Sequence, residues 1–233
     1  MPTINANGIH MYYEVQGTGE PLVVINSLGI EMEEFSAVTK PLKTEYKVLT
    51  FDNRGSGRSD KPDGPYSIPM MAQDSAEVMQ AAGFNNASVV GISLGGRIAL
   101  ELALQHPEMV NKLVLVSTGA RIQHSWARSL LTHTPLQFIY RGKYPQPRYA
   151  FIRQREASAN YDATARLSEI KNPTLIMHGR RDKVAPLAVA EELHNEIRGS
   201  KLLLFKGGHL FFLLREPQRF ISSLSDFLNG PRT

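Results

Sequence analysis

The chain has 233 residues, a formal net charge of +4, 42% hydrophobic residues and no cysteine. This length supports one globular domain with a substantial core, while the lack of cysteine excludes disulfides, thiolate metal ligands and a cysteine nucleophile. The first residues lack the basic and apolar segments of a signal peptide and the apolar runs are too short to span a bilayer, so we expect a cytoplasmic protein.

The first half of the chain is predicted to alternate between strands and helices. Asn7-Gly8 is typical of a hairpin turn between two short strands. Gly83 and His106-Pro107 are each placed to end a helix. In chain order we expect strands over 4–7, 10–15 and 22–25, a helix over 33–44, a strand over 47–51, a helix over 67–82, a strand over 87–92, a helix over 94–105 and a strand over 112–116.

The alternation stops between about residues 119 and 168, a stretch with prolines and clustered aromatic residues, and then resumes. The second half is predicted to contain strands over 173–178 and 201–205 and helices over 187–197 and 216–228. This order predicts an α/β fold, with a mostly parallel central sheet and helices on both faces. We expect one globular domain, made of a core over 1–119 and 169–233 and a small helical cap insertion over 120–168 at the carboxyl edge of the sheet, where such folds bind ligands.

The pentapeptide Gly91-Ile92-Ser93-Leu94-Gly95 lies between a predicted strand and a nearly apolar predicted helix. A serine hydroxyl is a poor nucleophile until a sharp turn exposes it and a base removes its proton. The glycines two residues before and after Ser93 leave room for the strained backbone of such a turn. A strand-to-helix turn without any chemistry is the alternative explanation of the same pattern.

Two further polar residues follow later predicted strands. Asp182 comes after the strand over 173–178, and His209 follows the last strand in a Gly-Gly loop. The chain order Ser, Asp, His is the one expected for a nucleophile elbow with its base and orienting acid. We expect His209 to take the Ser93 proton and Asp182 to orient the imidazole. The strand ending at Val116 is followed by no carboxylate, which leaves Asp182 as the candidate acid.

Acyl transfer also needs N–H groups aimed at the oxygen that becomes negative. The backbone N–H of Leu94, directly after the nucleophile, is one candidate, and that of Leu28, in the loop after the third strand, is the other. Asn26 and Ser27 come just before Leu28 and are candidates for the substrate pocket. A plain turn role explains both side chains equally well.

The glycines of Asp52–Ser59 follow a predicted strand and resemble a phosphate-binding loop. We reject that interpretation, because no Gly-Lys-Ser/Thr follows and no helix opens directly after them. We expect a tight turn pinned by Asp52 and Arg54.

Taken together, these motifs resemble the α/β-hydrolase superfamily over nearly the whole chain. The matching segments are Tyr13–Gly17, Asp52–Ser59, Gly91–Gly95, His106–Glu108, His178-Gly179 with Asp182 and Pro186, and Gly208-His209. Within the superfamily, residues 26–29, 91–96 and 118–122 look most like 3-oxoadipate enol-lactonases and related esterases. The resemblance implies a serine hydrolase with a helical cap, no cofactor and no metal. This chain departs from most relatives in having Asn26-Ser27 where they have His-Gly, and in its shorter cap.

The basic residues of the chain are concentrated in the predicted cap. No Asp or Glu occurs between positions 121 and 155, a stretch that contains Arg121, Arg128, Arg141, Lys143, Arg148, Arg153 and Arg155. A solvated face explains this charge, and so does the attraction of an anionic substrate, guided by Arg121, Arg128 or Arg148. Arg121 and Trp126 are our candidates for pocket residues in the cap.

The leading hypothesis is a hydrolase that cleaves a small-molecule carboxylic ester or lactone through an acyl-enzyme on Ser93. Carbon–carbon bond hydrolases, hydroxynitrile lyases and cofactor-free perhydrolases use the same triad and stay open, as does a ligand receptor on a hydrolase scaffold. A serine at the elbow argues against dehalogenases and epoxide hydrolases, which use aspartate there. We expect no nucleic-acid partner, since no binding motif accompanies the basic segment, and no membrane partner.

Overall fold

The computed structural model of the protein describes residues 3–122 and 143–230. Its centre is an eight-stranded sheet with the order β1-β2-β4-β3-β5-β6-β7-β8, in which β1–β2 and β2–β4 pair antiparallel and the other neighbours pair parallel. The strands are β1 (Thr3–Ala6), β2 (Ile9–Gln16), β3 (Glu20–Ile25), β4 (Tyr46–Phe51), β5 (Ala87–Ile92), β6 (Val110–Val116), β7 (Thr174–Gly179) and β8 (Lys201–Phe205). The prediction of a mostly parallel sheet is confirmed, with strand ends within a few residues of those expected.

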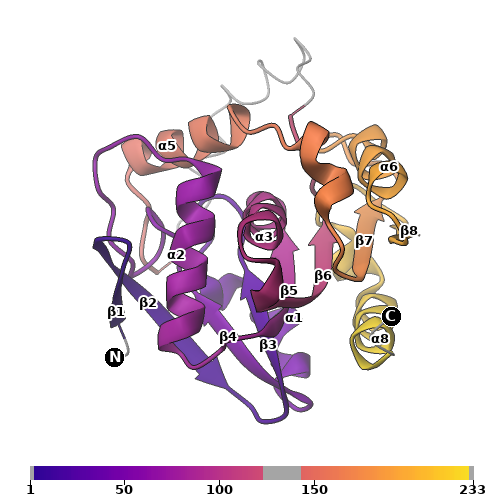
Figure 1. The fold of residues 1–233 in the computed structure, drawn as a ribbon, viewed down its shortest axis with the longest axis horizontal. Coiled ribbons are helices and arrows are strands. Elements are labelled where there is room, and N and C mark those ends of the chain that lie inside the picture. Colours follow the sequence, from indigo (N-terminus) through magenta and orange to yellow (C-terminus); the bar gives the residue numbers. More distant parts are fainter. Residues whose placement is uncertain (1–2, 123–142, 231–233) are drawn as a thin grey trace.

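Helices cover both faces of this sheet (Figure 1). Side chains alternate along the strands, so Val23 and Ile25 of β3 belong to one hydrophobic core while Leu22 and Val24 belong to the other. The first core lies under α2 (Ile68–Ala81), α3 (Leu94–Gln105) and α6 (Leu187–Glu196). The second lies under α1 (Ser36–Leu42), α7 (Phe212–Arg215) and α8 (Pro217–Asn229). The central strands, such as β3, are therefore buried on both sides, as their apolar runs predict.

The predicted helix over 67–82 is α2, and its ends have identifiable causes. The Ser67 hydroxyl accepts a hydrogen bond from the N–H of Met70 at 3.2 Å, which caps the first turn. After the helix, Gly83 adopts a φ of +76°, a conformation that glycine tolerates and most residues avoid.

The structure corrects one predicted helix and adds elements to the irregular stretch. The single helix expected over 33–44 is a 3-10 helix, η1 (Met32–Phe35), followed by the short α1. Pro41 lies inside α1 and lacks the N–H that would continue the hydrogen-bond pattern, so the helix ends one residue later. The irregular stretch after β6 contains ordered elements that the sequence analysis did not place, namely α5 (Arg148–Ala159) and the 3-10 helix η4 (Thr164–Glu169); η2 (Pro107–Met109) is a further 3-10 turn that precedes β6.

Helix α5 lies across the end of the molecule toward which β5, β6 and β7 point (Figure 1). It therefore lies over the carboxyl edge of the parallel strands, where the candidate site residues are found. Within the described ranges, no helix is long and apolar enough to cross a membrane.

Candidate active site

Ser93 lies at the sharp turn between β5 and α3 in a strained backbone conformation. Its φ is +55° and its ψ is −108°, values that a non-glycine residue rarely adopts. Three hydrogen bonds hold this residue: its N–H donates to the Val116 carbonyl at 2.9 Å, and its own carbonyl accepts from Gly96 N–H at 3.0 Å and Thr118 Oγ1 at 2.8 Å. The strain is thus sustained by main-chain bonds to β6 and α3 and by one side-chain bond from the residues that follow β6.

The glycines of the pentapeptide are required by close packing. A Cβ atom at Gly91 would lie 2.7 Å from the Ala99 Cβ and would overlap the Gly95 carbonyl oxygen. A Cβ atom at Gly95 would lie 2.6 Å from the Asn26 carbonyl oxygen and would overlap that of Ile25. Gly95 is therefore the point where the serine turn and the loop after β3 touch.

The structure brings together the three side chains that the sequence analysis grouped. His209 Nε2 is 3.0 Å from Ser93 Oγ, and His209 Nδ1 is 2.7 Å from Asp182 Oδ2. The other carboxylate oxygen, Asp182 Oδ1, accepts from the N–H groups of Val184 and Ala185, both at 2.8 Å. Because the buried carboxylate only accepts hydrogen bonds, it fixes the imidazole proton on Nδ1 and leaves Nε2 free to accept the serine proton.

The loop that carries His209 is held against the ends of its neighbouring strands. Arg180 N–H donates to the Phe205 carbonyl at 2.9 Å, and Arg181 N–H donates to the Gly207 carbonyl at 2.8 Å. The Ser117 hydroxyl donates to the His209 carbonyl at 2.5 Å. The histidine is thus positioned at the carboxyl edge of the sheet by main-chain bonds of its loop and by the Ser117 hydroxyl.

A second histidine, His178, lies behind the acid. Its side chain is fully buried, its Nε2 donates to the Ala185 carbonyl at 2.9 Å, and it is 3.6 Å from Asp182 Oδ2. Burial lowers the pKa of His178, because desolvation disfavours the imidazolium form. A neutral His178 carries no positive charge that would compete with His209 for the Asp182 carboxylate.

The loop after β3 forms a tight turn at residues 27–30. The Ile30 N–H donates to the Ser27 carbonyl at 3.4 Å, and Gly29 at the third position has a φ of +70°, which such a turn requires. Among the described residues no acceptor is bonded to the N–H of Leu28 or of Leu94. These are the two N–H groups expected to stabilise an oxyanion.

Gln154 in α5 is a residue at this loop that the sequence analysis missed. Its Oε1 accepts from the Gly29 N–H at 3.0 Å, while its Nε2 donates to the Arg54 carbonyl at 2.6 Å and to Ser56 Oγ at 2.9 Å. A weak sequence signal was present, because the buried residues of α5 recur at helical spacing: Ala150, Gln154, Ala157 and Ser158. That stripe indicates a packed face, and nothing in it indicates which loop the face contacts.

The remaining pocket candidates differ in their surroundings. Asn26 is fully buried, and its side-chain Nδ2 and Oδ1 have no hydrogen-bond partner among the described residues. Ser27 is also buried. The Arg121 guanidinium is engaged in an ion pair with Glu192 at 2.8 Å. Trp126 and Arg128 lie outside the described residues.

The turn after β4 is pinned differently from the prediction. Asp52 accepts from the N–H groups of Met32 at 2.8 Å and Arg58 at 2.9 Å, as expected of a residue that holds a turn. Arg54 instead forms a buried two-bond ion pair with Asp74 of α2, with a Nη2–Oδ1 distance of 2.6 Å. Arg54 therefore joins this turn to a helix, and Asp52 joins it to the segment after the 27–30 turn.

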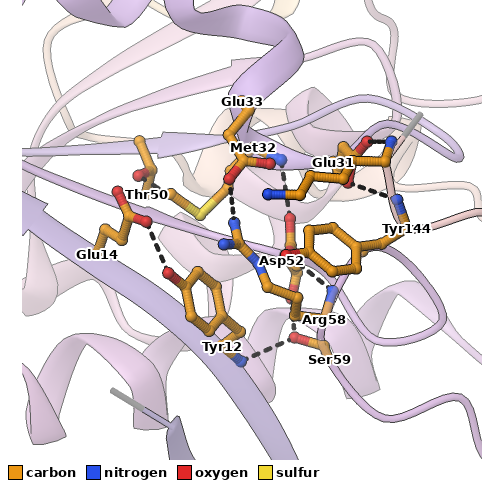
Figure 2. Close-up of polar contacts among 12 residues, drawn as sticks. Tyr12, Glu14, Glu31, Met32, Glu33, Thr50, Asp52, Arg58, Ser59 and Tyr144 are labelled. Atoms are coloured by element: carbon orange, nitrogen blue, oxygen red, sulfur yellow. Dashed lines mark hydrogen bonds and ion pairs between the residues drawn. The ribbon is translucent and has the colours of Figure 1, made fainter. Parts of the chain in front are cut away.

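Arg58 connects the turn after β4 to the described residues that precede α5, and Glu31 connects the segment after the 27–30 turn to the same residues (Figure 2). The Arg58 guanidinium lies 3.6 Å from the Tyr12 ring centroid and 4.9 Å from that of Tyr144. The Glu31 carboxylate accepts from the N–H groups of Lys143 at 2.5 Å and Tyr144 at 3.2 Å. Residues 143–144 are thus fastened beside the loop that carries Leu28. Over 3–122 and 143–230, no group of three or more His, Asp or Glu side chains could hold a metal ion.

Comparison with protein families settles the family. The model of the family described as "alpha/beta hydrolase fold" matches residues 20–140, a span that includes the 27–30 turn and the serine turn. The chain belongs to the alpha/beta hydrolase fold family. The family assignment agrees with the resemblance that the motifs indicate.

Relatives of this alpha/beta hydrolase align with nearly its whole length. The protein named "Putative carbamate hydrolase RutD" from Caulobacter segnis is 30% identical, with 99% of this chain and 100% of that protein covered. The structure of an esterase from Exiguobacterium antarcticum is 27% identical, with a TM-score of 0.85 and coverage of 98% and 99%. An enol-lactonase from Burkholderia xenovorans has a TM-score of 0.88 at 24% identity and coverage of 98% and 100%, a likeness that establishes the fold.

Proposed function

We propose that this alpha/beta hydrolase cleaves a small-molecule carboxylic ester or lactone through an acyl-enzyme on Ser93. The observation that carries the proposal is one continuous chain of hydrogen bonds. It runs from Ser93 Oγ to His209 Nε2 at 3.0 Å, and from His209 Nδ1 to the buried Asp182 carboxylate at 2.7 Å. A hydroxyl, an imidazole and a carboxylate in this order form the arrangement that makes a serine nucleophilic at neutral pH.

In the first half-reaction, His209 takes the proton of Ser93 while Oγ attacks the carbonyl carbon of the substrate. The carbonyl oxygen becomes negative and accepts hydrogen bonds from the N–H groups of Leu28 and Leu94, which have no competing acceptor among the described residues. When the tetrahedral intermediate collapses, His209 returns its proton to the leaving alkoxide. Asp182 stabilises the imidazolium in between without taking a proton itself.

In the second half-reaction, water replaces the leaving group. His209 Nε2 takes a proton from the water, whose oxygen attacks the acyl carbonyl, and the same N–H groups stabilise the second oxyanion. Collapse releases the carboxylic acid and returns the proton to Ser93 Oγ.

We propose further that residues 120–168 form a cap over this site and that an anionic ester or lactone is the preferred substrate. The position of α5 over the carboxyl edge of the sheet supports the cap (Figure 1), and the predominance of basic residues between positions 121 and 155 supports the anionic substrate. Arg148 is exposed at the start of α5, where its charge attracts anions toward the sheet edge.

A carbamate is a second candidate substrate class, favoured by the Caulobacter segnis relative that is 30% identical over the whole chain. A carbamate carbonyl is attacked by the same serine and forms the same kind of oxyanion. Its nitrogen makes the carbonyl less electrophilic, so the two classes are separated by turnover on matched substrates.

The test is labelling with a fluorophosphonate followed by a substrate panel. We expect stoichiometric labelling of the native protein, its loss in Ser93→Ala, and turnover of short-chain esters or lactones. The panel includes matched carbamates and carbon–carbon cleavage substrates, because those reactions use the same triad. An unlabelled native protein contradicts the proposed nucleophile.

A further inference from the structure

Gln154, which comes from the segment between β6 and β7 rather than from the core strands, contacts the loop that carries the Leu28 N–H. Its side chain has no exposed surface, and its Oε1 accepts from the Gly29 N–H across a separation of 125 residues. The orientation of the amide is unambiguous, because the Gly29 N–H can only donate and the Arg54 carbonyl, 2.6 Å from Nε2, can only accept. This side chain therefore has a specific position and a specific polarity.

The direction of the Leu28 N–H depends on two neighbouring peptide planes. In a trans peptide the carbonyl and N–H point in opposite directions, so the bond from Ile30 N–H to the Ser27 carbonyl turns the Leu28 N–H away from the turn. That bond is long at 3.4 Å and holds the plane weakly. The following plane ends in the Gly29 N–H, which is held by Gln154 at 3.0 Å.

We propose that Gln154 is a positioning residue that sets the direction of the Leu28 N–H and thereby the strength of the oxyanion site. This inference rests on the proposed acyl-enzyme function. The second bond of Gln154, to the Arg54 carbonyl, ties its side chain to a turn that a buried ion pair with Asp74 already fixes. A side chain that is fixed to a rigid turn on one side and bonded to the Gly29 N–H on the other is what a positioning role requires.

If Gln154 has this role, its removal should weaken stabilisation of the transition state and leave substrate binding nearly unchanged. Gln154→Met keeps the size of the side chain and removes all three hydrogen bonds. We expect kcat to fall tenfold or more with KM changed by less than threefold, since one well-placed oxyanion donor contributes about a hundred- to a thousandfold. The affinity for a trifluoromethyl ketone that carries the acyl chain of the best ester, and that forms an oxyanion on Ser93, should fall by the same factor as kcat. The affinity for the carboxylic acid product should change by less than twofold.

Ser158→Ala is the matched control. Ser158 lies one turn further along α5 and accepts from Arg97 Nη1 at 3.1 Å, so the variant removes a buried bond from the same helix without touching the loop of Leu28. We expect its kcat and ketone affinity to stay within twofold of native. All variants are compared at a temperature where circular dichroism finds them folded. If Gln154→Met does not fold, Gln154→Glu takes its place. Burial against the Arg54 carbonyl favours the protonated acid, which keeps an acceptor for the Gly29 N–H and a donor for that carbonyl, so this variant should lose less ketone affinity than Gln154→Leu.

The outcomes separate this inference from the proposed function. An unlabelled native protein overturns both. Labelling of the native protein together with native kcat and ketone affinity in Gln154→Met overturns the positioning role alone. A fall in kcat matched by an equal fall in product affinity also overturns it, because a general loosening of the pocket weakens both. Equal losses of ketone affinity in Gln154→Glu and Gln154→Leu also overturn the positioning role.

Discussion

The serine turn and the loop that carries Leu28 face each other across the candidate site, and they are held in different ways. Ser93 is held by hydrogen bonds to residues of β6, of α3 and of the turn directly after β6, its immediate neighbours in the fold. The 27–30 turn has one long internal bond, and its firmest contact is Gln154 from α5. The proposed nucleophile is therefore held by the core alone, while the proposed oxyanion loop is also held by the segment between β6 and β7. We therefore expect changes in that segment to alter the rate without disturbing Ser93.

The largest expected effect concerns the nucleophile side. In Asp182→Asn, the amide keeps its oxygen on the N–H groups of Val184 and Ala185 and turns its NH₂ toward His209 Nδ1. His209 Nδ1 then accepts a hydrogen bond from this NH₂, so the imidazole proton resides on Nε2, and Nε2 can no longer receive the proton of Ser93. We expect kcat to fall by about 10⁴-fold with little change in stability. Steady-state kinetics and thermal unfolding test this, and a loss below tenfold contradicts the assigned tautomer.

The next prediction concerns Gly95, where the two regions touch. In Gly95→Ala the added methyl meets the carbonyl oxygens of Ile25 and Asn26, so both the serine turn and the oxyanion loop must shift. We expect a loss of about 1–3 kcal/mol in the free energy of unfolding and a strong loss of kcat. The control is Gly64→Ala, since nothing lies within 4 Å of a Cβ atom there. Equal urea midpoints for the two variants argue against the close approach.

His178 provides a pH test of the nucleophile side. Burial lowers its folded-state pKa below the unfolded value of about 6.5. The unfolded chain therefore takes up a proton first as the pH falls, and stability present above pH ~6.5 is lost below it. In His178→Gln this contribution disappears, so we expect a shallower loss of unfolding free energy from pH 6.5 toward pH 5, by at most about 1.4 kcal/mol per pH unit. Urea unfolding at several pH values measures this difference. If the unfolding free energy of the native protein and of His178→Gln depends on pH in the same way, the lowered pKa of His178 is refuted.

The smallest effect concerns the charge of the predicted cap. If its basic residues attract the substrate, kcat/KM for an anionic ester should fall severalfold between low and physiological ionic strength, while a neutral ester of the same acyl group stays unchanged. Arg148→Gln should reduce the salt dependence and leave turnover at saturation intact. Identical salt responses for the two esters rule out steering.

Much of the sheet and the candidate triad follows from local sequence patterns. Apolar runs such as 22–25 identify strands that are buried on both faces, and parallel strands bring their carboxyl ends to one edge. Residues that directly follow those strands, such as Asp182 and His209, are therefore neighbours in any such fold. The predicted helix over 33–44 was wrong in detail, because η1 and α1 divide there and local pattern alone does not reveal the division.

Sequence alone determined the order of the elements, the parallel sheet and the three side chains that meet at its edge, because each depends on short-range periodicity or on the position of a residue relative to a strand end. Tertiary structure alone decided that Gln154 holds Gly29, that Arg58 lies over Tyr12 and Tyr144, and that Arg54 pairs with Asp74. Those contacts join separate segments of the chain. A glutamine or an arginine on a helix or turn is equally compatible with solvent, so only the packed fold selects its partner.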